Sequence, residues 1–208
     1  MFIDTHVHID VENFSLDRDA VLAQAHAVGV KQMVVPGIEV DGWSQLGSIC
    51  ARHAGLFPAL GIHPLFLPAD PVVAIEQLRH AVSQCRPVAI GEIGLDFWDK
   101  QVVREPQQRL LEAQLQLAVE FHLPVLLHVR KAHEQVVQML RHSGLVGGIV
   151  HAYGGSFEQA ECYIRLGFKL GIGGMVTYAR STRLRQLVRQ LQLESLVLET
   201  DAPDMSPT

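Results

Sequence analysis

Eight short apolar runs, rich in β-branched residues, alternate with longer segments of helical periodicity along the whole chain. In order, these runs are MFIDTHVH, KQMVVPG, LFPALGIHP, PVAIGEIG, LPVLLHV, VGGIVHA, FKLGIGG and SLVLETDAP. The clearest helix is predicted at residues 105–121, where one apolar stripe is formed by Leu110, Leu111, Leu115, Ala118 and Val119. Uninterrupted alternation of strand and helix predicts an α/β fold with a parallel sheet.

A closed (β/α)8 barrel, the TIM-like barrel, fits eight such repeats better than an open doubly wound sheet does. No glycine-rich nucleotide-binding loop follows any run, which also disfavours the open sheet. The last expected strand, residues 196–201, is followed by a loop and by no helical segment, so the side chains of Leu196 and Leu198 are expected to be exposed. Because there is no linker, residues 1–208 are expected to form one domain.

The composition disfavours a protein that binds nucleic acid through its overall charge and a protein that spans a membrane. A formal net charge of −5 means that the surface as a whole does not attract nucleic acid, so a local patch or metal ions would have to bind a polyanion. Three widely spaced cysteines are typical of buried free thiols in a reducing compartment. No basic or apolar leader begins the chain, and no apolar stretch approaches the roughly 20 residues needed to cross a bilayer. A cytoplasmic protein without a membrane partner is expected, and its oligomeric state stays open.

His6 and His8 give the strongest local signal of function. Side chains two positions apart on a strand point to the same face, so both imidazoles are expected to face the barrel interior and to bind one ion. Asp4 has the same parity, and we expect it to lie deeper and to orient an imidazole.

Further candidate ligands occur where other predicted strands end, at the rim on which barrels carry their active sites; they are Glu92, His128, His151 and Asp201. Buried carboxylates and imidazoles must be paired or coordinated, because an unpaired buried charge costs several kcal/mol. Four histidines and two carboxylates exceed the needs of one structural ion. They match two divalent ions about 3.5–4 Å apart that share a carboxylate.

A binuclear site of this kind suits phosphodiester hydrolysis. Two ions activate a water and neutralise the charge that grows on a phosphoryl oxygen, and Asp201 would accept a proton from that water. Zn, Mn, Ni, Co and Mg are all compatible with the ligand set, so the identity of the metal stays open.

Six segments resemble the signature segments of TatD-family metal-dependent hydrolases, within the wider amidohydrolase-like barrels; they are FIDTHVHID, GIHP, GEIGLDF, LLHVRKAH, VHAYGGS and LETDAPDM. The resemblance runs from residue 2 to residue 205 and implies a barrel with two divalent cations and, as in some members, 3′ to 5′ exonuclease action on DNA. It also implies which side chains hold each ion. One ion would be bound by His6, His8, Glu92 and Asp201, and the other by Glu92, His128 and His151.

Several residues near the expected cluster are candidates for contacts with substrate. His63, at the end of the third predicted strand, is expected either to contact a phosphate or to hold a loop. Arg130 shares the inward parity of His128 and offers a planar guanidinium to a phosphate. Aromatic side chains in the predicted rim loops either stack on bases of a single strand or cap the barrel; they are Phe97, Trp98, Tyr153 and Tyr178.

Two further features lie near the end of the chain. Glu199 shares the parity of Asp201 and is expected to face inward, where it would orient a ligand or hold a water. The glycines of GIGG, residues 171–174, are expected only to permit a tight turn.

Three functions stay open at this point. The favoured one is a metal-dependent deoxyribonuclease that hydrolyses phosphodiester bonds at DNA ends. An ester or amide hydrolase, such as an aminoacyl-tRNA deacylase, would use the same activated water. An inactive metal-binding fragment is the third, because family members typically continue with further helices after the ETDAP segment; its exposed eighth strand would then pair with another chain.

Overall fold

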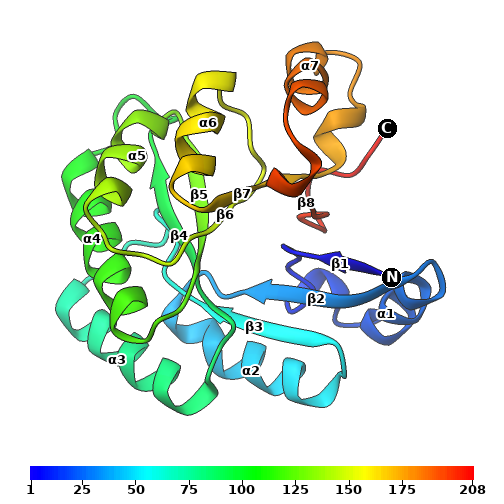
Figure 1. Ribbon diagram of the computed structural model, residues 1–208. Coiled ribbons are helices and arrows are strands. Elements are labelled where there is room, and N and C mark those ends of the chain that lie inside the picture. Colours follow the sequence, from blue (N-terminus) through cyan, green and yellow to red (C-terminus); the bar gives the residue numbers. More distant parts are fainter.

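The computed structural model describes residues 1–208 and contains one sheet of eight parallel strands, whose order in the sheet follows the sequence (Figure 1). The strands are β1 (Phe2–Asp4), β2 (Val30–Pro36), β3 (Leu56–Leu60), β4 (Ala89–Asp96), β5 (Val125–Arg130), β6 (Gly148–Val150), β7 (Phe168–Ile172) and β8 (Leu196–Leu198). Each strand coincides with one of the eight apolar runs, although β2, β4 and β5 extend beyond theirs by one or two residues, so the predicted parallel sheet is confirmed.

Seven α-helices connect the strands and cover the outside of the sheet (Figure 1). They are α1 (Arg18–Ala27), α2 (Trp43–Arg52), α3 (Pro71–Cys85), α4 (Arg104–Glu120), α5 (His133–Arg141), α6 (Phe157–Arg165) and α7 (Thr182–Gln190). The helix predicted at residues 105–121 is α4, shifted by one residue. Side-chain caps fix two of the helix starts: Asp70 accepts backbone N–H bonds at α3, and Ser156 forms a capping box with Gln159 at α6.

Backbone hydrogen bonds join the two ends of the sheet just beyond β1 and β8. The N–H of Thr5 donates to the carbonyl of Leu198 at 3.0 Å, and the N–H of Asp201 donates to the carbonyl of His6 at 2.8 Å. These bonds bring the eight strands into a nearly closed, TIM-like barrel, as the sequence predicts.

No helix follows β8, also as expected. Leu198 is 57% exposed, whereas Leu196 is half-buried, so the expected exposure holds fully only for Leu198.

The expectation of three buried thiols is wrong for two of them: Cys50 is buried, but Cys85 is exposed and Cys162 is half-buried. None of the helices has the length and apolar character needed to cross a membrane.

An irregularity in β4 determines which of its side chains face the barrel interior. Ile90 pairs with Val125 and Ile93 pairs with Leu127, so β4 uses three residues where β5 uses two. Ile90 and Ile93 therefore both pack into the main core, although strict alternation would place them on opposite faces. A bulge of this kind re-aims the side chains that it contains, here including Glu92.

An apolar layer fills the barrel interior below the polar side chains. It consists of a small buried cluster with its partly buried neighbours, namely Ala59, Ala89 and Leu126 with Val34 and Ile149. Residues two positions further along β5 and β6 share the orientation of Leu126 and Ile149. His128 and His151 occupy those positions, so they rise from this layer toward the carboxyl ends of the strands.

Candidate metal centre

All six predicted metal ligands lie together at the carboxyl ends of the strands; they are Glu92 in β4, His128 in β5, His151 directly after β6, Asp201 after β8, and His6 and His8 after β1. The two paired histidines lie beyond the strand rather than on it, because β1 ends at Asp4. Their Nε2 atoms are nevertheless 3.3 Å apart, so the two imidazoles converge as predicted.

The first set of ligand atoms consists of His6 Nε2, His8 Nε2, Glu92 Oε2 and Asp201 Oδ1. The nitrogen of His6 lies 3.3 Å from the Glu92 oxygen and 3.5 Å from the Asp201 oxygen. The nitrogen of His8 lies 3.6 Å from each of these oxygens. Ligands of one tetrahedral ion, each at about 2.0–2.2 Å from it, lie roughly 3.3–3.6 Å from one another. The printed nitrogen–oxygen separations are in this range, and His6, His8 and Asp201 form one group of side chains that could hold an ion, with the Glu92 oxygen beside it.

The second set gathers around the other carboxylate oxygen of Glu92. This Oε1 atom lies 2.9 Å from His151 Nε2, 3.0 Å from His128 Nδ1 and 3.5 Å from His63 Nε2. The nitrogens of His128 and His151 are 3.3 Å apart. Glu92 thus presents one oxygen to each of two histidine groups. His63, which the sequence suggests as a substrate contact, also lies within ligand distance of the second group.

Burial and neighbouring charges set the protonation of the cluster. Burial alone would raise the pKa of Glu92, but His151 and His6 pull this pKa well below its usual value, so the carboxylate is ionised. Burial lowers the pKa of His6 to about 3 and that of His63 to about 4, so both imidazoles are neutral. Burial also opposes protonation of His151, but Glu92 raises its pKa to about 9. This proton must leave before the imidazole can bind a metal ion.

Asp4 ties together the two chain segments that carry the first set. Its carboxylate accepts hydrogen bonds from the backbone N–H of His6 (3.2 Å), the backbone N–H of Thr200 (3.0 Å) and the hydroxyl of Thr200 (2.6 Å). The expectation that Asp4 orients an imidazole ring is therefore wrong, because its contacts are with the backbone of His6 and with Thr200. It fixes the exits of β1 and β8 relative to each other.

Asp96, which the sequence analysis did not single out, supports His128. Its Oδ2 lies 3.1 Å from His128 Nε2, and its Oδ1 accepts the backbone N–H of Trp98 at 2.9 Å. The Gln107 side chain in turn accepts the N–H of Asp96 at 2.9 Å. The carboxylate holds the imidazole so that its Nδ1 faces Glu92. Asp96 has the same parity as Glu92, which is the one signal in the sequence that points toward it, although parity alone does not separate it from other acidic residues at strand ends.

Glu199 is a buried carboxylate beside the cluster, and burial raises its pKa to about 7. Its Oε1 accepts the N–H of Ala152 at 2.5 Å, and its Oε2 has no hydrogen-bond partner in the protein. A Cβ atom at Gly171 would collide with this carboxylate. The expectation that the GIGG glycines only permit a turn is therefore wrong for Gly171, which lies within β7 and leaves room for Glu199.

The substitution Gly171→Ala is expected to destabilise the protein by about 1–3 kcal/mol, because the methyl group overlaps the Glu199 carboxylate in a packed interior. Chemical denaturation measures this loss. The matched control is Gly154→Ala, since a Cβ there meets only the carbonyl of Ala152, at 3.9 Å. If Gly171→Ala were as stable as its control, the steric role of this glycine would be refuted.

Two of the predicted substrate contacts stand beside the cluster. His63 is buried, and its ring meets that of Phe66 edge-on, with 5.9 Å between centroids. Arg130 is half-exposed at the end of β5, with its guanidinium 3.9 Å from Asp96 Oδ2 and 4.2 Å above the centre of the Trp98 ring. Contact of either side chain with a substrate stays a prediction.

Tyr153, the third predicted substrate contact, is placed differently from the expectation. Its side chain is only 1% exposed, and its hydroxyl donates to the carbonyl of Ser156 at 2.6 Å. Its ring packs against His133 and Tyr163 in the core between barrel and helices. No face of this ring is open to a base, so the predicted role of Tyr153 is corrected to a structural one.

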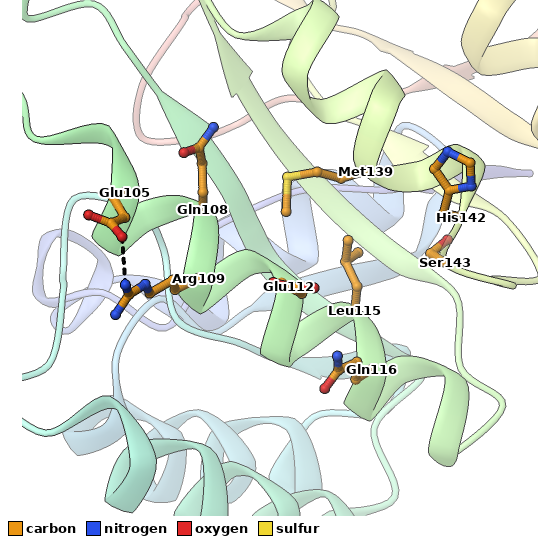
Figure 2. Close-up of a pocket in the computed structure, with 9 residues that line it drawn as sticks. All are labelled: Glu105, Gln108, Arg109, Glu112, Leu115, Gln116, Met139, His142 and Ser143. Atoms are coloured by element: carbon orange, nitrogen blue, oxygen red, sulfur yellow. Dashed lines mark hydrogen bonds and ion pairs between the residues drawn. The ribbon is translucent and has the colours of Figure 1, made fainter.

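Two hollows on the outside of the barrel lie apart from the cluster. One, of about 530 Å³, lies between α4 and α5 and is lined by side chains such as Glu105, Arg109 and Met139 (Figure 2). The other, of about 630 Å³, lies between α3 and α4. No residue of the cluster lines either hollow.

The barrel and the buried histidines and carboxylates at its mouth define a metal-dependent hydrolase. The chain belongs to the TatD family, since residues 3–208 match the family model described as TatD related DNase.

Comparisons with individual proteins agree with this assignment. The chain is 42% identical over 207 residues to the uncharacterized metal-dependent hydrolase YjjV of Escherichia coli K12, covering 98% of this chain and 80% of that protein. It is 34% identical over 213 residues to the 3′-5′ ssDNA/RNA exonuclease TatD of Salmonella typhimurium, with the same two coverages. The crystal structure of YjjV matches with a TM-score of 0.95 at 40% identity, covering 100% of this chain and 81% of that one.

Proposed function

We propose that this protein is a nuclease that hydrolyses phosphodiester bonds at the ends of DNA strands with two divalent ions. The placement of Glu92 carries the proposal, because its two carboxylate oxygens face separate groups of histidines. One carboxylate shared in this way suits two ions about 3.5–4 Å apart, as in two-metal phosphatases and nucleases. The relative named as a 3′-5′ ssDNA/RNA exonuclease supports the same reaction. The free thiols support action in the cytoplasm.

The proposed ligands follow the two sets of atoms at the barrel mouth. One ion would be held by His6, His8, Glu92 and Asp201, and the other by Glu92, His128 and His151. Imidazole-rich sets suit Zn, Mn, Ni or Co, and the carboxylates also admit Mg. When bound, the ions would activate a water and neutralise charge on the phosphoryl group.

The protein's own groups would position the diester and accept the proton of the water. Asp201 is the proposed proton acceptor, because its carboxylate lies beside the nitrogens of His6 and His8, where the activated water would be held. Arg130 offers its half-exposed guanidinium to the non-bridging oxygens of a phosphate. His63 is buried with its Nε2 3.5 Å from Glu92 Oε1, and it would contact the group that leaves.

The direct test offers the metal-loaded protein four substrates: single-stranded DNA labelled at its 5′ end, bis(p-nitrophenyl) phosphate, a carboxylic ester and an aminoacyl-tRNA. The proposal expects a ladder of DNA products shortened from the 3′ end, and slower hydrolysis of the small diester. Hydrolysis of the ester or the aminoacyl-tRNA alone would replace it with an ester hydrolase. Two bound ions without any hydrolysis would identify an inactive metal-binding protein.

Replacement of Asp96 tests how His128 is held. We expect Asp96→Ala to weaken binding of the second ion about 100-fold and Asp96→Asn about tenfold, because an amide oxygen still accepts a hydrogen bond from the imidazole but lacks the charge. Titration of the metal-free variants with Zn²⁺ measures these losses without any assay of activity. Asp99→Asn, at an exposed aspartate in the loop after β4, is the matched control. Unchanged affinity in Asp96→Ala would remove Asp96 from the site.

A further inference from the structure

Trp98 is the exposed aromatic side chain of the loop after β4, and 59% of it faces solvent. Its neighbour in sequence, Phe97, is only 4% exposed. Only Trp98 therefore presents an open ring here. Single exposed aromatic residues are common on proteins, so its surroundings must decide whether this one binds a ligand.

Two cations stand next to the Trp98 ring. The Arg130 guanidinium lies over the ring, 4.2 Å from its centre, and also 3.9 Å from Asp96 Oδ2. The Lys131 ammonium lies 5.8 Å from the ring centre. Both side chains are exposed at the end of β5. On a protein whose net charge is −5, an exposed indole flanked by two positive charges is a local site for an aromatic anion.

This platform, meaning Trp98 with Arg130 and Lys131, is firmly attached to the cluster. The backbone N–H of Trp98 donates to Asp96 Oδ1 at 2.9 Å, and Asp96 Oδ2 lies 3.1 Å from His128 Nε2. The N–H of Phe97 donates to the carbonyl of Arg130 at 2.8 Å, which fixes the two loops to each other. A ligand stacked on the indole is thus held next to the second set of ligand atoms.

We propose that Trp98 is a stacking platform for a nucleobase of single-stranded nucleic acid, with Arg130 and Lys131 binding the adjoining phosphates. The inference rests on the proposed phosphodiesterase function and adds to it the residue that contacts the bases of the substrate. A base must leave its own stack to lie on the indole, and this costs less in a single strand than in a duplex. Every base has a flat π face, so the platform selects single strands without selecting sequence.

Fluorescence tests the platform independently of catalysis. The protein has two tryptophans, and Trp43 is 7% exposed, so quenching by a ligand in solution reports on Trp98. With a chelator present, we expect a ten-residue oligothymidylate to quench the indole and an abasic strand of equal length and charge to leave it unquenched. Trp98→Phe identifies the signal, because only Trp43 remains. Equal quenching by both strands, or none by either, would overturn the proposal.

Affinity for a labelled oligothymidylate, measured by anisotropy, gives a second readout. Trp98→Ala is expected to weaken binding about tenfold, which corresponds to about 1.4 kcal/mol, and Trp98→Phe to restore most of the loss. Phe2→Ala is the matched control, since Phe2 is 53% exposed at the start of β1, the opposite end of the barrel from the cluster. Wild-type affinity in Trp98→Ala would contradict the platform.

The substitution Arg130→Gln separates the contribution of charge from that of stacking. It is expected to weaken the binding of base-bearing and abasic strands alike. Arg109→Gln, on the outside of α4, is its control. If Arg130→Gln bound both strands as tightly as its control, the phosphate contact would be refuted.

Failure of the platform and failure of the proposed function are distinguishable. Cleavage of DNA by wild type with unchanged binding in Trp98→Ala refutes the platform alone. Base-dependent quenching without cleavage refutes the nuclease alone.

Discussion

Glu92→Gln is expected to empty both metal positions and to lower phosphodiester hydrolysis by about a thousandfold or more, because groups that act as a unit are lost together. The side chain keeps its size, but one of its two oxygens becomes an amide nitrogen that cannot bind a cation. In the wild-type protein, each carboxylate oxygen of Glu92 faces its own histidine group. Oε1 lies 2.9 Å from the nitrogen of His151 and 3.0 Å from that of His128, and Oε2 lies 3.3 Å from that of His6. No orientation of the amide can serve both groups.

Elemental analysis of the purified variant and an assay with bis(p-nitrophenyl) phosphate measure the two effects separately. Glu105→Gln is the matched control, because Glu105 is exposed on the outer surface of α4 and pairs there with Arg109. A Glu92→Gln variant that retained two ions would refute the bridging role. Two empty positions with unchanged hydrolysis would refute the dependence of the reaction on the cluster.

Asp201→Asn is expected to have a different effect on metal content. Asp201 contributes only to the first set, where its oxygen lies 3.5–3.6 Å from the nitrogens of His6 and His8. The variant should lose the first ion and keep the second, whose ligands it leaves in place. Hydrolysis should fall about a hundredfold to a thousandfold, since the proposed proton acceptor and one charge at the reacting centre are lost.

Metal content per chain and the turnover number, determined on the same preparation, test this expectation. Asp204→Asn is the control, because Asp204 lies three residues further along the same loop and is exposed. Loss of both ions in Asp201→Asn would show that the two positions fill together, against the separate sets described above. Wild-type turnover would exclude Asp201 as the proton acceptor.

The fold was predictable because its signals are repeated along the chain. Each strand is a compact apolar run, and each helix carries its own periodicity, as α4 shows at Leu110, Leu111 and Leu115. The order of strands in the sheet then follows from the preference of consecutive parallel strands to lie side by side. Local pattern and global topology agree throughout, so no single ambiguous run could change the result.

The convergence of the cluster was also predictable, since all its residues belong to the same end of a parallel barrel. Distances were not, because they depend on detail that residue type does not reveal. The bulge between Ile90 and Ile93 sets the orientation of Glu92, and Gly91 in the strand marks such a bulge but does not give the distances that result from it. Asp96 shares parity with Glu92 but resembles any acidic residue at a strand end.

Tyr153 shows the limit of interpreting rim residues by type. A tyrosine after the sixth strand fits a substrate-stacking role as well as a structural one, and only its packing distinguishes them. Its hydroxyl donates a hydrogen bond to the carbonyl of Ser156 at the start of α6, and this bond allows the whole ring to be buried. Trp98 shares the same kind of position but finds no such cover, and it is exposed.

The first set of ligand atoms draws on both ends of the sequence, whereas the second comes from β4 and the two strands after it. An ion in the first position would therefore bridge the seam of the barrel, beside the hydrogen bond from Asp201 to His6. Occupancy of that position and closure of the seam would then be thermodynamically linked, because an ion that binds only the closed arrangement would stabilise it. If an ion occupies that position, a chelator that removes it is expected to loosen the contact between the first and last strands.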